Sequence, residues 1–338
     1  MTESGKPLRV AFAGFRHGHV FDLFAGVSES DTMEIVACCE EDAQTRGVLA
    51  REGKVSITHE SITTMLESVE CDVVAVGDYY GRRGSIIIEC LKRGKHVIAD
   101  KPVCTRLAEL DEIERLTSGK RLTLGCQLDM RDKGQFIRMR ELALAGTIGD
   151  IHAISVGGQH PLLPESRPRW YFEEGKHGGT INDIGIHAFD LIPWMTGLSF
   201  ELILAARNWN AMARDYPHFL DAGQFMLRMT NGCGVLGDVS YLMPGTMGYT
   251  MEQYWRTILW GSKGMMEASL RAPEVLLALT ADQSQKRIAP APGVVRGYLE
   301  AFRREVQGCP VPGAITTRDV ITASRTALAV QLAGEKSG

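Results

Sequence analysis

Residues 8–28 read LRVAFAGFRHGHVFDLFAGVS, which is an apolar run, a short turn with glycines and a second apolar run. The first run favours a buried strand, and the second repeats apolar positions at the spacing of a helix. When a strand passes through a glycine turn into a helix, backbone N–H groups and the helix dipole face any anion bound there. The stretch therefore predicts the start of a doubly wound fold that binds the phosphates of a dinucleotide.

The same alternation of strand-like and helix-like segments continues to about residue 125. Strands are expected at residues 8–13, 34–39, 72–76, 96–99 and 121–124. Helical patterns lie at residues 19–28, 43–52, 61–67, 85–93 and 107–118. Strands regularly separated by helices form βαβ units, whose parallel sheet is covered on both faces. Residues 1–125 of this α/β chain are therefore predicted to be an NAD(P)-binding Rossmann domain.

The pattern changes from about residue 126, where strand-like runs follow one another. Strands are expected at residues 151–159, 201–208, 223–229, 234–241, 254–260, 265–269 and 275–280. Helices are expected at residues 133–145, 183–196, 294–307 and 317–335. A short turn with Asn231 and Gly232 is typical of antiparallel neighbours. Residues 126–338 are therefore predicted to be an α+β domain for substrate binding and oligomerisation, with an open, mostly antiparallel sheet.

Length and composition restrict the class of protein. A chain of 338 residues exceeds the size of most single cores, which supports two domains. The formal net charge of -4 offers no basic excess for nucleic acid, and no uncharged span is long enough to cross a bilayer. No signal-type segment precedes the first strand, and the eight cysteines include no C-x-x-C pair. We expect a cytoplasmic protein with reduced thiols and without nucleic-acid or membrane partners.

The glycine turn and the end of the second strand carry the candidate cofactor residues. The turn covers residues 14–19, and its candidates are Gly14, Phe15, Arg16 and His17. Only Gly14 fits the G-x-G-x-x-G spacing, so an ordinary strand-to-helix turn is the alternative. Glu40 lies about twenty residues further on, where a carboxylate accepts hydrogen bonds from the adenosine ribose. Glu40 would repel a 2′-phosphate, which favours NAD over NADP; a solvated loop charge is the other interpretation.

A further candidate follows the fourth strand, in the sequence Asp100-Lys101-Pro102. The carboxyl ends of parallel strands form the edge at which doubly wound sheets bind ligands. Because proline disfavours the helical region for the residue before it, we expect the Lys101 side chain to turn toward that edge. A surface cation is the alternative interpretation of Lys101.

The candidate catalytic pair lies in GGTINDIGIHAFD, residues 178–190. Asp183 and His187 are four residues apart, a spacing that places them on one face of a helix. A carboxylate that holds a hydroxyl beside an imidazole that takes its proton suits alcohol oxidation when a hydride acceptor is bound. A helix start with a structural histidine is the alternative. Two possible ligands without a recognisable third predict no metal site.

The order of these motifs resembles that of one family. The glycine turn, the acidic strand end, Asp100-Lys101-Pro102, and the glycines before Asp183 and His187 are similar to the glucose-fructose oxidoreductase, inositol dehydrogenase and rhizopine catabolism (Gfo/Idh/MocA) family. The resemblance covers nearly the whole chain. It implies an NAD(P)-dependent dehydrogenase that acts on CH–OH groups of sugars, inositols or related polyols. It also implies a homodimer or homotetramer formed through the C-terminal sheet.

The resemblance implies a role for each motif residue. Lys101 is similar to the lysine of the family's Glu-Lys-Pro motif, with Asp100 in place of glutamate. Asp183 and His187 resemble the substrate-binding aspartate and the catalytic histidine, which acts as general acid and base. Lys101 then stabilises the developing alkoxide. Asp78 stands where members commonly carry threonine, so we expect it to border the cofactor.

Other features of the chain bear on the same interpretation. Arg16 replaces the usual second glycine, so it either crowds the pyrophosphate or supplies a guanidinium to it. The long loop at residues 161–179 contains Arg169 and Trp170 as candidate substrate contacts, with a buried loop anchor as the alternative for Trp170. The family also implies two other functions. One is an NAD-dependent glycoside hydrolase, and the other is a noncatalytic protein that senses sugars or dinucleotides.

Overall fold

The computed structural model describes residues 6–337, which divide into two compact units. The first unit contains the residues up to Gln127 together with Tyr298–Ile321. The second contains Leu128–Gly297 together with the residues from Thr322 onward. Within the described range, no helix is both long enough and apolar enough to span a membrane.

Five parallel strands in the order β2-β1-β3-β4-β5 form the sheet of the first unit. They are β1 (Leu8–Ala13), β2 (Met33–Cys39), β3 (Val73–Val76), β4 (His96–Ala99) and β5 (Leu124–Cys126). Every residue of β3 is buried, as expected for a central strand with helices on both faces. The strand order reverses between β1 and β3, so the ends of these strands form the switch point where such sheets bind ligands. The predicted Rossmann fold is confirmed.

The helices of the first unit start close to their predicted positions, with one exception. They are α1 (Val20–Ser28), α2 (Ala43–Glu52), α3 (Ile62–Ser68), α4 (Tyr80–Lys92), α5 (Leu107–Lys120) and, from its second residue, α8 (Gly297–Val306). The prediction started α4 at residue 85, but the helix begins at Tyr80. Its first turns contain two glycines and two arginines, which interrupt the apolar pattern. In the structure, one of those arginines, Arg83, is fully buried.

Eight strands form the sheet of the second unit, in the order β13-β12-β11-β10-β6-β9-β8-β7. They are β6 (Ile151–Pro161), β7 (Phe200–Trp209), β8 (Ala222–Met229), β9 (Gly234–Met243), β10 (Arg256–Gly261), β11 (Gly264–Ala268), β12 (Val275–Leu279) and β13 (Lys286–Ile288). Only the β6 and β9 pairing is parallel among these strands, so the sheet is mixed and mostly antiparallel, as predicted. The edge strand β13 was not predicted, because it is short and begins with two charged residues.

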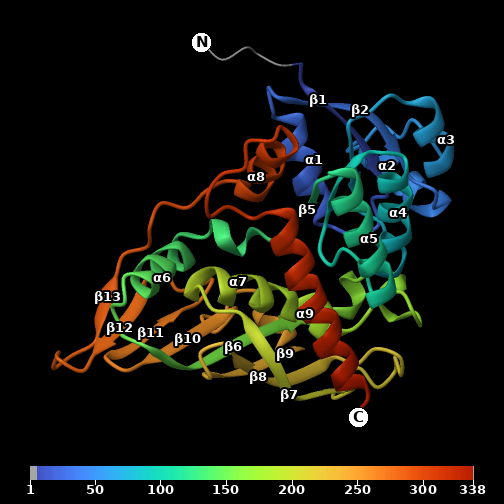
Figure 1. The fold of residues 1–338 in the computed structure, drawn as a ribbon. Helices are drawn as coiled ribbons and strands as arrows, with labels where there is room; N and C mark the ends of the chain where they lie inside the picture. Colours follow the sequence, from blue (N-terminus) through green and yellow to red (C-terminus); the bar gives the residue numbers. More distant parts are fainter. Residues whose placement is uncertain (1–5, 338) are drawn as a thin grey trace. The chain divides into compact units, whose positions relative to one another are not determined.

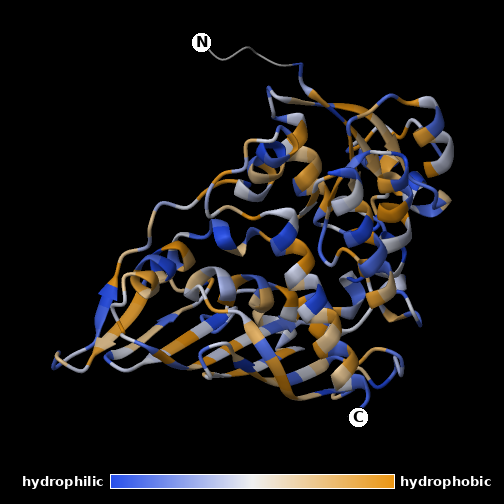
Figure 2. Cartoon of the chain, in the orientation of Figure 1, coloured by the Kyte–Doolittle hydropathy of each residue, from blue (hydrophilic) through white to orange (hydrophobic). Residues whose placement is uncertain are grey.

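Helices α6 (Gly134–Leu144) and α7 (Ile186–Thr196) lie on one face of this sheet (Figure 1). A π-helical turn, Ile181–Gly185, leads directly into α7. The strands carry alternating hydrophobic and hydrophilic bands (Figure 2), because successive side chains point to opposite faces. Large apolar side chains are exposed on the other face, namely Leu202, Met226, Leu236 and Trp260. The last helix, α9 (Thr317–Glu335), has its predicted range.

Candidate active site

The turn after β1 packs directly against the end of β3. Gly14 has a left-handed φ of +88°, and a side-chain carbon placed there would lie 2.8 Å from the backbone nitrogen of Asp78. Only glycine tolerates this close approach. Gly18, later in the turn, faces open space, and no described side chain caps the start of α1. The turn thus presents the positive end of α1, which suits the pyrophosphate of a dinucleotide.

Glu40 holds this turn against the end of β2. The side chain is buried, and its carboxylate accepts hydrogen bonds from the backbone N–H groups of Phe15 and Asp42, at 2.7 Å and 2.8 Å. Burial raises the pKa of Glu40, although these two hydrogen bonds act in the opposite direction. The carboxylate therefore positions the turn, a structural task that the sequence interpretation did not include.

Two arginines border the same turn. Nη1 of Arg16 lies 4.0 Å from a carboxylate oxygen of Asp42, and its guanidinium carbon is 5.4 Å from the centre of the Tyr79 ring. Nη1 of Arg82 lies 3.1 Å from a carboxylate oxygen of Asp78, which is itself buried. Arg16 therefore packs on an aromatic ring at the edge of the turn. Arg82 is also paired with Glu41, so carboxylates balance the charge of both arginines beside the predicted pyrophosphate site.

A buried hydrogen-bond network surrounds Asp100, directly after β4. Its Oδ2 atom bonds to Nδ1 of His17 and lies 2.8 Å from Nη2 of Arg83. The second ring nitrogen of His17 lies 3.0 Å from the hydroxyl of Tyr80. Burial lowers the pKa of His17 to about 4, so the imidazole is neutral at pH 7. Burial opposes ionisation of Asp100, but the Arg83 guanidinium and His17 hold the pKa of that carboxyl well below its usual range.

The same network fixes the backbone around Lys101. Nη1 of Arg83 donates to the carbonyl oxygens of Asp100, Lys101 and Pro102, at 2.9, 2.6 and 3.1 Å. Lys101 is itself buried, with 4% of its surface exposed. A planar guanidinium that binds three successive carbonyls holds the peptide in one conformation. The backbone of Lys101, the lysine with the predicted catalytic role, is therefore held in place by hydrogen bonds.

Three possible metal ligands occur in this region. Ligand atoms of His17, His19 and Asp100 lie within 4.8 Å of one another. His19 is half exposed, and its Nδ1 atom lies 3.4 Å from Oδ1 of Asp100. Arg83 already supplies a positive charge to this carboxylate, and a metal ion would have to share it with the guanidinium. We therefore interpret the group as a hydrogen-bond network and assign it no metal.

Asp183 and His187 lie where the π-helical turn passes into α7. Asp183 belongs to the π-helix, and His187 to the first turn of α7. The side-chain oxygen of Gln331 accepts a hydrogen bond from the backbone N–H of Ile181 at 2.9 Å, which holds the start of the turn. The predicted α-helix over residues 183–196 is therefore wrong in its first turn. Such π-helical turns frequently occur at functional sites.

Asp183 is buried in the second unit between a tyrosine and a histidine. The hydroxyl of Tyr241 donates a hydrogen bond to Oδ2 of Asp183. Nε2 of His177 lies 3.5 Å from the same carboxylate oxygen and 3.2 Å from the Tyr241 hydroxyl. Burial and the charge of Asp183 raise the pKa of Tyr241 well above its usual value, so the phenol keeps its proton. These contacts fix the orientation of the Asp183 carboxylate.

The His187 ring belongs to a cluster of aromatic side chains in the second unit. Its centre is 4.8 Å from that of Trp255, which lies 5.4 Å from His160. His160 in turn lies 5.2 Å from Tyr254 and 5.8 Å from Tyr249, measured between ring centres. His187 is 7% exposed. Aromatic faces with a few polar groups among them are typical of small-molecule sites.

The backbone is strained at the centre of this cluster. Trp255 has a φ of +55°, in the left-handed region that bulky residues rarely adopt. Gly158 makes room for the indole, because a side-chain carbon there would lie 2.7 Å from the ring of Trp255. Backbone strain of this kind costs about 1–3 kcal/mol and concentrates at functional sites. The position of Trp255 therefore supports a role in ligand binding.

The loop before the π-helix brings Arg167 to the aromatic cluster. Its guanidinium carbon lies 5.0 Å from the centre of the Tyr171 ring and 5.5 Å from that of Tyr241. Arg169 is exposed, and Trp170 is 2% exposed. The burial of Trp170 fits the loop anchor that the sequence left open. Substrate contacts by Arg169 and Trp170 stay predictions.

Sequence reasoning did not identify Tyr241 or Arg167 as parts of this site. Tyr241 occupies an inward position of a strand, where an aromatic residue has the same pattern as the core. Arg167 and Arg169 flank one proline, and no spacing distinguishes them. Arg167 is half-buried against the rings of Tyr171 and Tyr241, whereas Arg169 is exposed. Both properties require the folded structure.

Two family profiles match the chain. The profile described as "Oxidoreductase family, NAD-binding Rossmann fold" matches residues 8–127, and the "GFO/IDH/MocA C-terminal domain" matches residues 136–267. The chain is 25% identical to a dTDP-3,4-didehydro-2,6-dideoxy-alpha-D-glucose 3-reductase of Streptomyces violaceoruber, over 91% of this chain and 89% of that protein. It is 26% identical to a myo-inositol 2-dehydrogenase of Thermotoga maritima, over 72% of this chain and 70% of that protein.

A third relative matches over a shorter range. The chain is 28% identical to a scyllo-inositol 2-dehydrogenase (NADP(+)) of Bacillus subtilis, and the match spans 42% of this chain and 40% of that protein. Among solved structures, an inositol dehydrogenase homolog complexed with NAD+ from Azotobacter vinelandii has a TM-score of 0.80, with 15% identity over 100% of this chain and 99% of that one. The two profiles together cover most of both halves, and the chain belongs to the Gfo/Idh/MocA oxidoreductase family.

Proposed function

We propose that this protein is an NAD-dependent oxidoreductase that moves hydride between nicotinamide and a secondary alcohol of a sugar, inositol or related polyol. One observation carries the proposal. Asp183 and His187 are buried next to a cluster of aromatic rings, in a chain of this oxidoreductase family. The inositol dehydrogenases and the deoxysugar reductase among its relatives support the substrate class.

Three residues have separate tasks in the proposed reaction. His187 takes the hydroxyl proton as general base, a step that typically contributes about 10² to 10⁴ in rate. Lys101 supplies an ammonium group to the oxygen on which negative charge develops. Asp183 accepts a hydrogen bond from a neighbouring hydroxyl and orients the sugar. Bound NAD supplies the hydride acceptor. The same side chains serve ketone reduction when the reaction runs in reverse.

We assign cofactor binding to residues 1–125 and substrate binding to residues 126–338. Gly14, Phe15, Arg16, His17 and Asp78 border the cofactor in this proposal, with Lys101 near the nicotinamide and Glu40 near the adenosine ribose. The open space at Gly18 and the uncapped start of α1 support a pyrophosphate there.

The end of β2 favours NAD over NADP. A 2′-phosphate needs a positive partner, and Glu40 supplies a carboxylate instead. Arg16 is one nearby cation, and its Nη1 atom lies 4.0 Å from a carboxylate oxygen of Asp42. Arg46 is another, but its Nη2 atom lies 2.8 Å from Glu60, and its Nη1 atom donates to the carbonyl oxygen of Glu40 at 3.0 Å. Its charge is therefore already paired.

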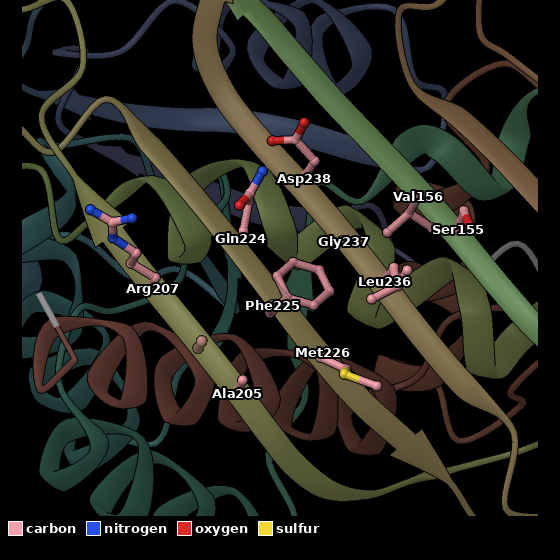
Figure 3. A pocket seen from close by; sticks show the side chains of 11 residues that line it. Ser155, Val156, Ala205, Arg207, Gln224, Phe225, Met226, Leu236, Gly237 and Asp238 are labelled. Carbon is pink, nitrogen blue, oxygen red and sulfur yellow. The ribbon is translucent and has the colours of Figure 1, made fainter.

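The face of the eight-stranded sheet opposite α6 and α7, here called the bare face, supports a homo-oligomer. Figure 3 shows Met226 and Leu236 on neighbouring strands, in register, in a shallow depression of this face. A polar row of Arg207, Gln224 and Asp238 crosses the same strands. Contiguous exposed apolar side chains rimmed by polar ones are typical of protein interfaces. A second copy of the chain is the occupant that we propose.

Two measurements test the proposed function. Titration with NAD and with NADP, followed by fluorescence or thermal shift, is expected to show stronger binding of NAD. Incubation with NAD and a panel of inositols, sugars and sugar acids is expected to accumulate reduced nicotinamide with at least one of them. Release of the alcohol from glycosides without net reduction of NAD would instead indicate the glycoside hydrolase. Absence of binding by either dinucleotide would contradict an oxidoreductase.

A further inference from the structure

Arg167 is a cation that lacks an anionic partner in the described structure. Its Nε atom donates to the carbonyl of Leu162 at 3.0 Å, and Nη2 donates to the carbonyl of Pro161 at 3.2 Å and to the hydroxyl of Tyr249 at 3.1 Å. All three acceptors are neutral. Between residues 6 and 337, no carboxylate oxygen lies within 4.0 Å of its nitrogens.

Two arginines with buried guanidinium groups are paired with a carboxylate. Nη2 of Arg83 lies 2.8 Å from a carboxylate oxygen of Asp100, and Nη2 of Arg131 lies 2.6 Å from one of Asp190. Charged groups removed from water are normally paired in this way, because an unpaired one loses hydration without compensation. Arg167 is half-buried by the loop and by two aromatic faces, and it differs from both.

The hydrogen bonds of Arg167 leave one end of its guanidinium available. A guanidinium has five N–H donors, one on Nε and two on each terminal nitrogen. The three bonds above use the Nε donor and both Nη2 donors. The two donors of Nη1 have no acceptor in the described structure. Each of these donors can bond an oxygen of an incoming carboxylate, and a hydrogen bond between two charged groups is stronger than one between neutral groups.

Arg167 belongs to the same cluster as the proposed catalytic pair. The Tyr241 ring, which lies beside the guanidinium, carries the hydroxyl that bonds to Asp183. The Tyr249 ring, whose hydroxyl accepts from Arg167, lies 5.8 Å from His160. His160 contacts Trp255, which in turn contacts His187. A ligand held by Arg167 would therefore lie beside the aromatic cluster whose members contact Asp183 and His187.

We propose that Arg167 and Tyr249 form a carboxylate subsite, and that the substrate is an acidic sugar or polyol of the uronate or aldonate class. The inference rests on the proposed function and narrows its substrate. A single guanidinium balances one carboxylate charge. A phosphate carries close to two negative charges and would meet more repulsion from the carboxylate of Asp183, whose charge acts on Arg167. The aromatic rings contact the C–H faces of the sugar, and Asp183 accepts one of its hydroxyls.

Equilibrium binding tests the subsite independently of turnover. Calorimetric titration would compare gluconate with glucitol, and glucuronate with glucose, because each pair differs in one carboxylate. The wild-type protein is expected to bind each acid about 10- to 100-fold more tightly, the range for a hydrogen bond to a charged group. In R167M the preference disappears, and the affinity for the neutral member stays. Added salt reduces the preference.

Two further variants complete the design. R167K keeps the positive charge but lacks the planar guanidinium, so it is expected to keep part of the preference for acids. Partial preference in R167K would show that misfolding is not the cause of the loss in R167M. R214M removes an exposed arginine of the second unit and is expected to change nothing. When turnover is measured, R167M should raise KM for the acid and leave kcat close to the wild-type value, because the lost contact is present throughout the reaction.

The outcomes separate this inference from the proposed function. Equal affinity of wild type for acid and neutral ligands, or an acid preference that survives in R167M, would overturn the carboxylate subsite. Oxidation of neutral polyols with no preference for acids would keep the proposed function and reject the subsite. Arg167-dependent binding of acids without oxidation of any alcohol would keep the subsite and reject the proposed function.

Discussion

Two buried aspartates, Asp100 in the first unit and Asp183 in the second, have similar neighbours but differ in whether a cation contacts the carboxylate. Each carboxylate is bonded to a histidine or a tyrosine. Asp100 also pairs directly with Arg83, at 2.8 Å. Beside Asp183, the ring of Tyr241 packs against the guanidinium of Arg167, and no ion pair forms between the two charges in the described structure. Asp100 is thus paired directly with its cation, whereas an aromatic ring lies between Asp183 and Arg167.

This difference separates a network that supports the fold from one that supports binding. Inside a protein, a paired charge is stable only with its partner, so removal of the partner mainly lowers the stability of the fold. A cation without a direct anionic partner, such as Arg167, can gain one from a bound anionic ligand. Substitutions around Asp100 should therefore change stability, and substitutions around Asp183 should change substrate affinity or rate.

The largest effect is expected from His187→Asn. Loss of the proposed general base should lower kcat by about 10² to 10⁴. The unfolding temperature should stay close to that of wild type, because asparagine keeps a polar side chain in the cluster. Steady-state kinetics and thermal unfolding measure the two effects. His218→Asn is the control, since His218 is an exposed histidine of the same unit. Full activity of His187→Asn would remove His187 from the mechanism.

Arg83→Met tests the direct ion pair of Asp100. The substitution leaves Asp100 buried without its cation, which should lower the free energy of unfolding by about 3–5 kcal/mol. Urea unfolding provides the measurement. Adding Asp100→Asn to Arg83→Met removes the unpaired charge, so the double variant should recover part of the loss. No recovery in the double variant would show that the ion pair is not the source of the stability.

His17→Gln tests the same network through pH. Burial lowers the pKa of folded His17 from 6.5 to about 4. As the pH falls through 6.5, the unfolded chain takes up a proton at His17 and the folded protein does not, so stability decreases until about pH 4 is reached. The decrease amounts to about 3 kcal/mol from this residue. His17→Gln should therefore lose less stability than wild type between pH 6.5 and pH 4. Parallel urea-unfolding curves across this range would contradict the assignment.

The smallest effect on stability is expected from Leu236→Glu on the bare face of the large sheet. An exposed substitution changes the free energy of unfolding by about 0.5 kcal/mol or less. In a face-to-face oligomer the same change buries a charge, so the complex should dissociate. Sedimentation or light scattering measures the mass. An unchanged oligomer would place the interface elsewhere, and Glu201→Gln at the exposed edge strand serves as the control.

The fold could be predicted where apolar periodicity is strong. β3 and α9 follow their patterns closely, because buried strands and long amphipathic helices have regular spacing. The start of α4 could not be predicted, because an arginine such as the buried Arg83 is expected at the surface when only the sequence is known. The π-helical turn before α7 also escaped prediction. It depends on a hydrogen bond from Ile181 to Gln331, which is 150 residues away in the chain.

Some residues of the candidate site could likewise be predicted from the sequence, and others could not. Asp183, His187 and Lys101 could be proposed because they lie in short motifs with a fixed spacing. Arg167 could not be preferred over Arg169, because the distinction depends on which arginine meets aromatic rings from distant strands. Glu40 shows a further limit of spacing. Its place after β2 predicts ribose binding, whereas its burial and its bonds to the turn add a structural task.

A crystal structure with NAD and a bound substrate provides the test of the proposed mechanism. The most useful ligands are the sugar acid that binds most tightly and its neutral relative. The proposal requires Nζ of Lys101 and a ring nitrogen of His187 to lie within about 3 Å of one substrate oxygen, with the carbon that bears it against the nicotinamide. A substrate that contacts only one of these two side chains, or a nicotinamide that faces neither of them, would contradict the proposal.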